Sequence, residues 1–248
     1  MSGLEVRNDK GNYVIDGQYR NLSLRYRRSF PASALASGFP PYHRLEIQIP
    51  QASLKGRPMF FIKASVGDRL AFQPMYLYQG NLWLEVTCWS NQKPQGPFEI
   101  FVFDDYTPAS LEFGLDVFSS TGERVYNTAW PIMQIERIVN IPNGLPTLNG
   151  PNNIYTVNGF TDTSTIATGL SSNRTYYHGR PTGDGYSLMP AARRNIGSID
   201  FTQVCFGSES EDFPGGGSVA FSGYLGSGDT TVIFVETKQL PPAPFGVL

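Results

Sequence analysis

The sequence contains few cysteines and no long apolar segment. Its two cysteines, Cys88 and Cys205, match neither a disulfide framework nor a metal-binding spacing, so we expect two buried free thiols. No apolar run approaches the roughly 18 residues that a membrane-spanning helix needs, and the first ten residues lack the apolar core of a signal peptide. We therefore expect no membrane span and no signal peptide.

Charge is scarce as well. Charged residues make up 16% of the 248 residues, and 19 Lys and Arg against 21 Asp and Glu give a net charge of −2. Domains that bind nucleic acids are usually basic. We therefore expect no nucleic-acid partner.

The residue patterns of common catalytic sites are also missing. The sequence has no Gly-x-Ser-x-Gly motif, no Cys/His cluster with zinc spacing and no phosphate-binding loop with its lysine. The adjacent acids Asp104 and Asp105 would point to opposite faces of a strand, so they cannot flank one glycosidic bond. We predict no catalytic residues, no metal site and no cofactor, and hence a protein that is not an enzyme.

Glycine, proline and aromatic residues are abundant instead. There are 26 Gly, 19 Pro, 13 Tyr and 17 Phe, a composition typical of short strands joined by tight turns. Alternating apolar and polar residues predict strands at 45–49, 58–65, 69–78, 82–89 and 98–103. Residues 32–37 and 189–195 are the stretches that can form one or two helical turns. The predicted fold class is therefore all-β.

An internal repeat predicts the domain plan. Residues 3–6 (Gly-Leu-Glu-Val) recur 111 positions later as residues 114–117 (Gly-Leu-Asp-Val), and Leu24 then matches Ile135. Near the ends, residues 100–102 (Ile-Phe-Val) recur as 233–235, at an offset of 133. We predict two tandem antiparallel β-sandwich-like domains, 1–108 and 109–248, each opening with a similar hairpin. The alternative is two unrelated hairpins that share a common turn pattern.

The second unit is the longer one, and the extra residues are expected within 140–194. An insertion in a surface loop costs little stability and often carries function, although it can also be a plain connector. Within it, aromatic rings, an arginine and an aspartate gather on a Gly-rich segment, which predicts contact with a receptor such as a sugar or protein surface. The alternative is a hairpin whose tyrosines pack on the domain surface. The predicted contact residues are Tyr176, Tyr177, His178, Arg180, Asp184 and Tyr186.

A second candidate surface lies after the first hairpin. Leu22, Leu24 and Tyr26 are predicted to form one apolar strand face, and Arg25 and Arg27 to share the other, basic face. We predict that Arg25, Arg27 and Trp130, which follows the second hairpin, form an assembly interface. A solvated strand face that discourages edge pairing is the alternative for the two arginines.

The repeated opening also carries a resemblance. In both copies, 3–20 and 113–131, a Gly-Leu-acidic-Val start is followed by a glycine at the tip and an apolar strand that ends in Asp16 or Asn127. This pattern resembles the small tail-tip and baseplate (minor tail) proteins of long-tailed bacteriophages. The usual Asp-Ser after the hairpin appears here as Asp16-Gly17 and Asn127-Thr128.

The resemblance implies a virion protein of the tail tip or baseplate, made in the host cytoplasm, without catalytic residues. It implies other tail proteins as partners, self-association into a homo-oligomer such as a trimer, and contact with a host cell-surface receptor. We expect the first domain to dock to the tail and the second to face outward. The alternatives are a carbohydrate-binding module or lectin outside a virion, and a cell-wall or capsule hydrolase.

Overall fold

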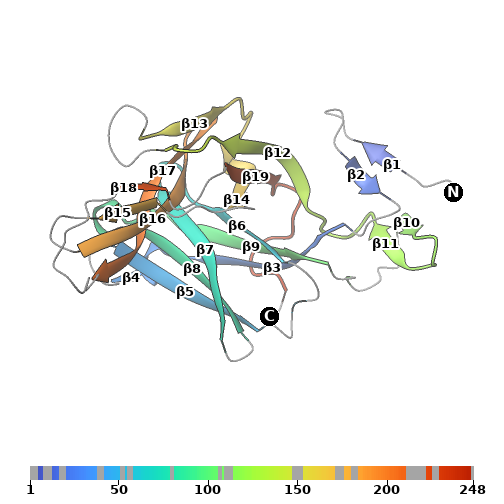
Figure 1. Ribbon diagram of the computed structural model, residues 1–248. Coiled ribbons are helices and arrows are strands. Elements are labelled where there is room, and N and C mark those ends of the chain that lie inside the picture. Colours follow the sequence, from blue (N-terminus) through green and yellow to red (C-terminus); the bar gives the residue numbers. More distant parts are fainter. Residues whose placement is uncertain are drawn as a thin grey trace.

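The computed structural model describes most of the chain and is built from strands (Figure 1). The described residues are 5–7, 13–16, 21–37, 42–50, 54, 58–78, 81–105, 108, 114–146, 153–170, 176–179, 184–210, 222–224 and 229–246. They contain three short 3-10 helices, η1 (Ala32–Ala34), η3 (Ser90–Gln92) and η4 (Thr163–Thr165), and no α-helix. The prediction of an all-β fold is therefore confirmed.

Two antiparallel sheets and two hairpins make up the described fold. The six-stranded sheet has the order β12 (Gln134–Ile141), β19 (Thr230–Glu236), β14 (Ile166–Leu170), β6 (Met59–Lys63), β9 (Phe98–Asp104) and β3 (Ser23–Phe30). The nine-stranded sheet has the order β13 (Tyr155–Asn158), β17 (Ser198–Ser210), β16 (Asp184–Arg194), β7 (Arg69–Tyr78), β8 (Asn81–Trp89), β5 (Tyr42–Pro50) and β4 (Ala36–Ser37). Its other two strands are β15 (Tyr176–Gly179), which pairs with β16, and β18 (Ser222–Tyr224), which pairs with β15. The hairpins are β1 (Glu5–Arg7) with β2 (Tyr13–Asp16), and β10 (Asp116–Phe118) with β11 (Arg124–Asn127).

The strand order reads alike from both edges of each sheet. From one edge of the six-stranded sheet the order is β3, β9, β6, and from the other it is β12, β19, β14. The nine-stranded sheet gives β13, β17, β16 from one edge, and it gives β5, β8, β7 from the other edge, inside the two-residue strand β4. Each half contributes six of these strands. Numbered in chain order within a half, strands 1, 6 and 3 lie in the six-stranded sheet, and strands 2, 5 and 4 lie in the nine-stranded sheet.

The two halves nevertheless share their sheets. Strand β14 pairs with β6 at Thr168 and Ile62, and β16 pairs with β7 at Ala192 and Leu70. We call these two contacts, β6 with β14 and β7 with β16, the seam. Because the seam joins both sheets edge to edge, the described strands form one continuous pair of sheets, and separate tandem domains are not shown.

Each half has its own apolar core between the two sheets. The first contains Tyr26, Phe60, Leu84 and Ile100, and the second contains Val157, Ile166, Phe201 and Phe234, among others. A third cluster covers the opposite face of the six-stranded sheet with residues of both halves, including Phe61, Phe103, Ala167, Val235 and, from the C-terminal segment, Leu240. The third cluster therefore ties the halves together across the seam.

Register refines the internal repeat. Strand β3 bulges between Leu24 and Tyr26 and β12 between Ile135 and Arg137, which are matched positions at the offset of 111. Opposite them, Phe103 pairs with Leu24 and Val235 with Ile135, so β9 and β19 correspond at 235 − 103 = 132. The predicted offset of 133 is wrong by one residue, because it pairs the inward-facing Ile100 with the outward-facing Ile233.

The same bulge corrects the predicted faces of β3. Leu24 packs in the cluster outside the six-stranded sheet, whereas Tyr26 packs in the core between the sheets. A bulge adds one residue to a strand and so reverses the alternation beyond it. Leu24 and Tyr26 therefore do not share an apolar face.

Two further expectations are corrected by the strand pairing. The predicted helical turn at 189–195 is largely the end of β16, paired with β17 through Arg194. The additional elements of the second half are β15 and β18, which lie in two separate connections rather than in one loop within 140–194. Pro190 fits the strand because it pairs with Gln203 at a point between the stretches where β16 meets β15 and β7.

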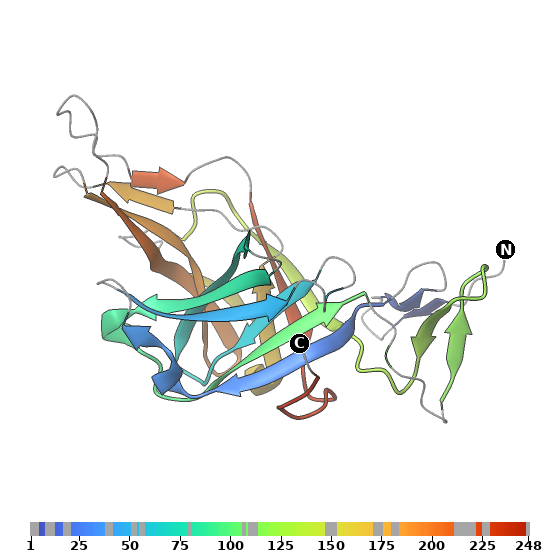
Figure 2. The ribbon, with the colours of Figure 1, turned by 90° about the horizontal axis from the view of Figure 1, so that it is seen from below.

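Both hairpins lie at one end of the molecule, beyond β3 and β12, and β15 and β18 lie at the opposite end (Figures 1 and 2). Each hairpin leads directly into the edge strand of the six-stranded sheet in its half. The link after the second hairpin also pairs with β3, because Leu24 N donates to Pro131 O at 2.7 Å and Met133 N donates to Leu22 O at 2.8 Å. The hairpin end is therefore attached to the sheet by backbone hydrogen bonds.

Candidate functional site

The hydrogen bonds within the second hairpin show why the repeated motif has these residue types. The Asn127 side chain donates to the Asp116 carboxylate at 2.6 Å and accepts from Ala129 N at 2.7 Å. Thr128 Oγ1 accepts from Leu115 N at 3.0 Å. Gly114 has φ +133°, and a Cβ there would lie 2.5 Å from Thr128 Oγ1. The acidic residue, the Asn-Thr pair and the first glycine thus form one local network.

The turn and the small core of this hairpin account for the rest of the motif. Gly122 at the tip has φ +81°, a conformation that favours glycine. Val117, Val125, Tyr126, Trp130 and Ile132 form a separate apolar cluster. Trp130 is buried there, within its own chain, so the structure places this predicted interface residue in the base of the hairpin.

Part of the hairpin surface is apolar and exposed. Leu115 and Phe118 are 55% and 53% exposed, and the Arg124 guanidinium lies 5.7 Å from the centre of the Phe118 ring. Arg124 also pairs with Asp116, with Nε 3.1 Å from Oδ1. An exposed aromatic beside a fixed charge pair is a surface of the kind that protein partners contact.

The first hairpin has the same register. Glu5 pairs with Asp16, Val6 with Ile15 and Arg7 with Tyr13, and a bulge follows Val6. In the second hairpin the pairs lie 111 residues later, with a bulge after Val117. The predicted similarity of the two hairpins therefore extends to the pairing of individual residues.

Arg27 lies in a charge cluster within the chain. Its guanidinium is 2.8 Å from the Glu99 carboxylate, and Lys63 Nζ reaches the same carboxylate at 2.5 Å. Burial favours the neutral form of Glu99, but hydrogen bonds and charge from Lys63 and Arg27 outweigh it and lower the pKa of this carboxyl. Arg27 also donates to Pro241 O at 2.5 Å, so it fastens the C-terminal segment to β3.

The C-terminal segment adds to this contact along the edge of β3. Arg27 N donates to Phe245 O and Phe245 N donates to Arg27 O, both at 3.0 Å. Gly246 has φ +72°, and a Cβ there would collide with the Arg25 carbonyl oxygen. Arg25 is the bulged residue of β3. The predicted interface arginines thus lie on a strand edge that the protein's own C-terminal segment covers.

The predicted receptor-contact cluster lies at the other end of the molecule. Tyr176, Tyr177 and His178 belong to β15 and pair with Leu188, Ser187 and Tyr186 of β16, while Asp184 begins β16. The side chains of these residues, and the whole of Arg180, lie outside the described residues. The backbone pairing confirms a hairpin here and leaves the contact role a prediction.

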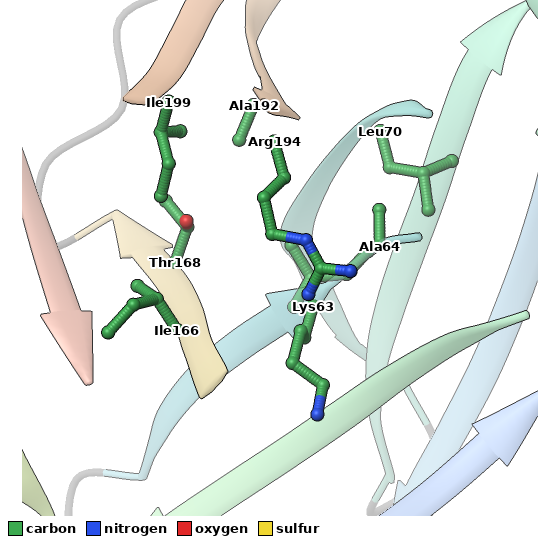
Figure 3. A pocket seen from close by; sticks show the side chains of 9 residues that line it. Lys63, Ala64, Leu70, Ile166, Thr168, Ala192, Arg194 and Ile199 are labelled. Atoms are coloured by element: carbon green, nitrogen blue, oxygen red, sulfur yellow. The ribbon is translucent and has the colours of Figure 1, made fainter. Parts of the chain in front are cut away.

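A small cavity lies at the seam, between the two cores (Figure 3). Its volume is about 10 Å³, which is room for no more than one water molecule. Side chains of both halves line it, among them Ile62 and Leu70 from the first and Thr168 and Arg194 from the second. Burial lowers the pKa of Arg194, and its Nη1 donates to Ser164 O at 3.2 Å. The seam is thus closely packed.

Two titratable groups of β8, Cys88 and Glu85, are buried in the first half. Cys88 is buried and free, as predicted, and burial raises the pKa of its thiol to about 11; the side chain of Cys205 lies outside the described residues. Glu85 is fully buried, neither of its carboxylate oxygens has a hydrogen-bond partner among the described residues, and burial raises its pKa to about 7. Arg44 Nη1 lies 3.8 Å from Glu85 Oε2, and its positive charge acts to lower this pKa.

Groups of three or more potential metal ligands do not occur among the described side chains. In the same part of the chain, no helix is long and apolar enough to cross a membrane.

Comparison with known proteins returned no similar chain: no protein-family model, no curated protein and no solved structure matches this one.

Proposed function

We propose that this chain is a non-enzymatic component of a bacteriophage tail tip or baseplate, and that it contributes to host attachment. The observation that carries the proposal is the duplicated hairpin. Both copies share the Gly-Leu-acidic-Val start, the same residue pairing and a bulge at the same step, and both lie at one end of the molecule. This is the element in which the sequence resembles minor tail proteins.

The two halves are best explained as copies of one unit, approximately 1–108 and 109–248, that remained joined through their sheets. Matched strand order and the matched bulges of β3 and β12 support this duplication. Tail assemblies are symmetric, and a C₂ or C₃ ring needs a repeated contact surface. We propose that the hairpin end, with the exposed Leu115 and Phe118, supplies this contact in a homo-oligomer such as a trimer.

Receptor contact is proposed for the opposite end. Strands β15 and β18 occur in the second half without a counterpart in the first, and elements added to a shared scaffold are common carriers of function. This end includes Tyr176, Tyr177 and His178. Because the hairpins lie at the opposite end (Figures 1 and 2), docking of the tail on the hairpin side would leave this end pointing away from the tail.

Immunogold electron microscopy of purified phage particles from the source genome, with antibody against this chain, tests the proposal. We expect gold at the tail tip, and purified protein should then compete with phage for adsorption to cells if the added strands contact the receptor. Particles without gold, from a lysate in which the protein is detected, would contradict the virion assignment and favour a carbohydrate-binding module outside a virion.

A further inference from the structure

An open pocket of about 390 Å³ lies where β7 and β16 meet at the seam. Its cations are Arg69 at the start of β7, Arg193 near the end of β16, and Lys93 in the loop after β8. The rest of the lining consists of the amide side chains of Asn91, Gln92 and Gln95, together with Gly67 and Asp68. A volume of this size lies in the range of small-molecule sites.

The two arginines form a like-charge pair. Arg193 and Arg69 are directly opposite each other across the two strands. Like charges in this position destabilise a sheet. Burial and the charge of Arg193 lower the pKa of Arg69, and together they outweigh the charge of Asp200, which raises it. An anion between the guanidinium groups would remove this repulsion.

Donor capacity remains on both guanidinium groups. Each Nε is buried and has no hydrogen-bond partner among the described residues, although Arg69 Nη1 donates to Gln92 Oε1 at 2.9 Å. The nearby carboxylate of Asp200, opposite Arg193 on β17, already accepts from Thr156 and Asn195 at 2.7 Å each. Buried unpaired donors carry a desolvation cost that a bound oxyanion would remove.

The pocket walls are held in place before any ligand arrives. The Asp68 carboxylate, itself buried, accepts from Gln95 N at 3.0 Å and from Gly96 N at 2.9 Å, which fixes the loop after β8. Gly67 N donates to Arg194 O at 2.8 Å, which joins the turn before β7 to β16. Because both carboxylate oxygens of Asp68 accept hydrogen bonds from the loop, this carboxylate stabilises the wall of the pocket.

We propose that this pocket binds an oxyanion carried on a sugar, with Arg69 and Arg193 holding the phosphate or carboxylate. A guanidinium pairs with either anion through two parallel hydrogen bonds. The pocket is much larger than the anion alone, and its remaining lining, the amides with Asp68 and Gly67, is polar rather than apolar, which suits hydroxyl groups. This pocket is separate from the predicted receptor-contact residues of β15 and the start of β16, and the proposal holds whether or not the chain belongs to a virion.

Thermal unfolding and titration calorimetry of the full chain test the proposal with glucose 6-phosphate, glucuronate and uncharged glucose. We expect the two charged sugars to raise the Tm and to bind, and glucose to do neither at the same concentration. The charged sugar with the larger effect identifies the anion that the pocket prefers. Equal effects from glucose and the charged sugars would contradict the proposal.

Arg69→Gln and Arg193→Gln separate a binding role from a structural one. Each should weaken charged-sugar binding by about tenfold or more, which corresponds to one charge-assisted hydrogen bond. Each should also raise the Tm of the ligand-free protein, because the like-charge pair is gone. Lys238→Gln, an exposed cation elsewhere, is the matched control and should change neither quantity. A lower ligand-free Tm in both arginine variants, with charged-sugar binding unchanged, would show that the arginines are structural and overturn the proposal.

Discussion

The two halves of the molecule differ most at the point where they meet. Met59 pairs with Phe103 in the first half, and Ala167 pairs with Val235 at the equivalent place in the second half. Two residues further along each strand, Phe61 of β6 therefore corresponds to Gly169 of β14. A Cβ on Gly169 would lie 2.6 Å from the Phe61 ring and 2.9 Å from Phe60 O. Two equivalent positions that face each other at a seam cannot both carry a large side chain. The halves have therefore become complementary, and neither can replace the other.

The outer edges of the six-stranded sheet show a second difference. Arg27 on β3 corresponds to Ile138 on β12 at the offset of 111. Arg27 is buried under the C-terminal segment and bound to Glu99, whereas Ile138 is 56% exposed. One edge is thus covered by the chain's own end, while β12 has β19 as its strand neighbour among the described residues.

The central strands of the nine-stranded sheet differ in how they accommodate acidic residues. Glu85 on β8 has Glu46 directly opposite on β5, whereas Asp200 on β17 has Thr156 opposite on β13, and Thr156 donates to it. An acidic neighbour raises the energy of the charged Glu85, and a hydroxyl neighbour satisfies Asp200. The charged form is thus disfavoured at Glu85 in one half, whereas Asp200 in the other half is hydrogen-bonded.

The largest expected effect comes from the seam. Phe61→Ala removes a fully buried ring and should lower the free energy of unfolding by about 3–5 kcal/mol. Gly169→Ala should cost about 1–3 kcal/mol through overpacking. In the Phe61→Ala background Gly169→Ala should cost clearly less, because the ring that it meets is gone. Urea unfolding of the four proteins measures this coupling, and strictly additive costs would contradict the contact.

The edges should respond unequally to truncation. Arg27→Ala leaves Glu99 paired with Lys63 alone and frees the C-terminal segment, so we expect a loss of about 3 kcal/mol. Ile138→Ala, its counterpart, is a surface change and should stay within about 0.5 kcal/mol. Equal losses in chemical denaturation would mean that the C-terminal segment contributes nothing to the β3 edge.

Acid should also weaken the Arg27 contact. The pKa of Glu99 is lowered in the folded state, so its contribution is present above the unfolded pKa of roughly 4.3 and is lost as pH falls through the folded value. The difference in stability between the parent protein and Arg27→Ala should therefore shrink in acid. A difference that stays constant from pH 7 to pH 3 would contradict this ion pairing.

Glu85 should show the opposite pH dependence. Its folded pKa of about 7 lies well above the ordinary value of a glutamate carboxyl, so the folded state binds the proton more tightly. Stability should fall as pH rises from about 4.5 to 7, by about 2–3 kcal/mol in total. Glu85→Gln should remove this pH dependence and stabilise the protein at pH 8. An unchanged profile in the variant would assign the dependence to other groups.

The smallest effect is expected in the hairpin. Asn127→Ala removes the hydrogen bonds to Asp116 and Ala129 and should cost about 1 kcal/mol. Because the hairpin has its own small core, the loss should appear as faster amide exchange in residues 114–130. Asn140→Ala on β12 is the control and should leave this exchange unchanged.

Local pattern was enough to predict most strands of the first half and both hairpins. Period-two alternation located β7 at residues 69–78, and the repeat at an offset of 111 predicted the matching registers of the hairpins. Alternation failed at Arg25, because a bulge leaves no clear mark in the sequence and yet moves Tyr26 to the opposite face. It also failed at 189–195, where alanines and arginines suit a helix but pairing with β17 prevails.

The arrangement of the halves could not be predicted in this way. The seam depends on contacts between residues more than 100 positions apart, such as Ile62 and Thr168, and short apolar segments carry no record of their partners. The pocket shares this origin, because Arg69 and Arg193 become neighbours through the seam alone. From the sequence alone, each arginine is expected to be an ordinary surface residue.

Hydrogen exchange of the parent protein and of Gly169→Ala tests the shared sheets most directly. If β6 and β14 form one sheet, the substitution in the second half should speed amide exchange in both β14 and β6, and in β7 and β16 beside them. Faster exchange confined to β14 and its own half, with β6 and β7 at parent rates, would contradict the seam and show two independent domains.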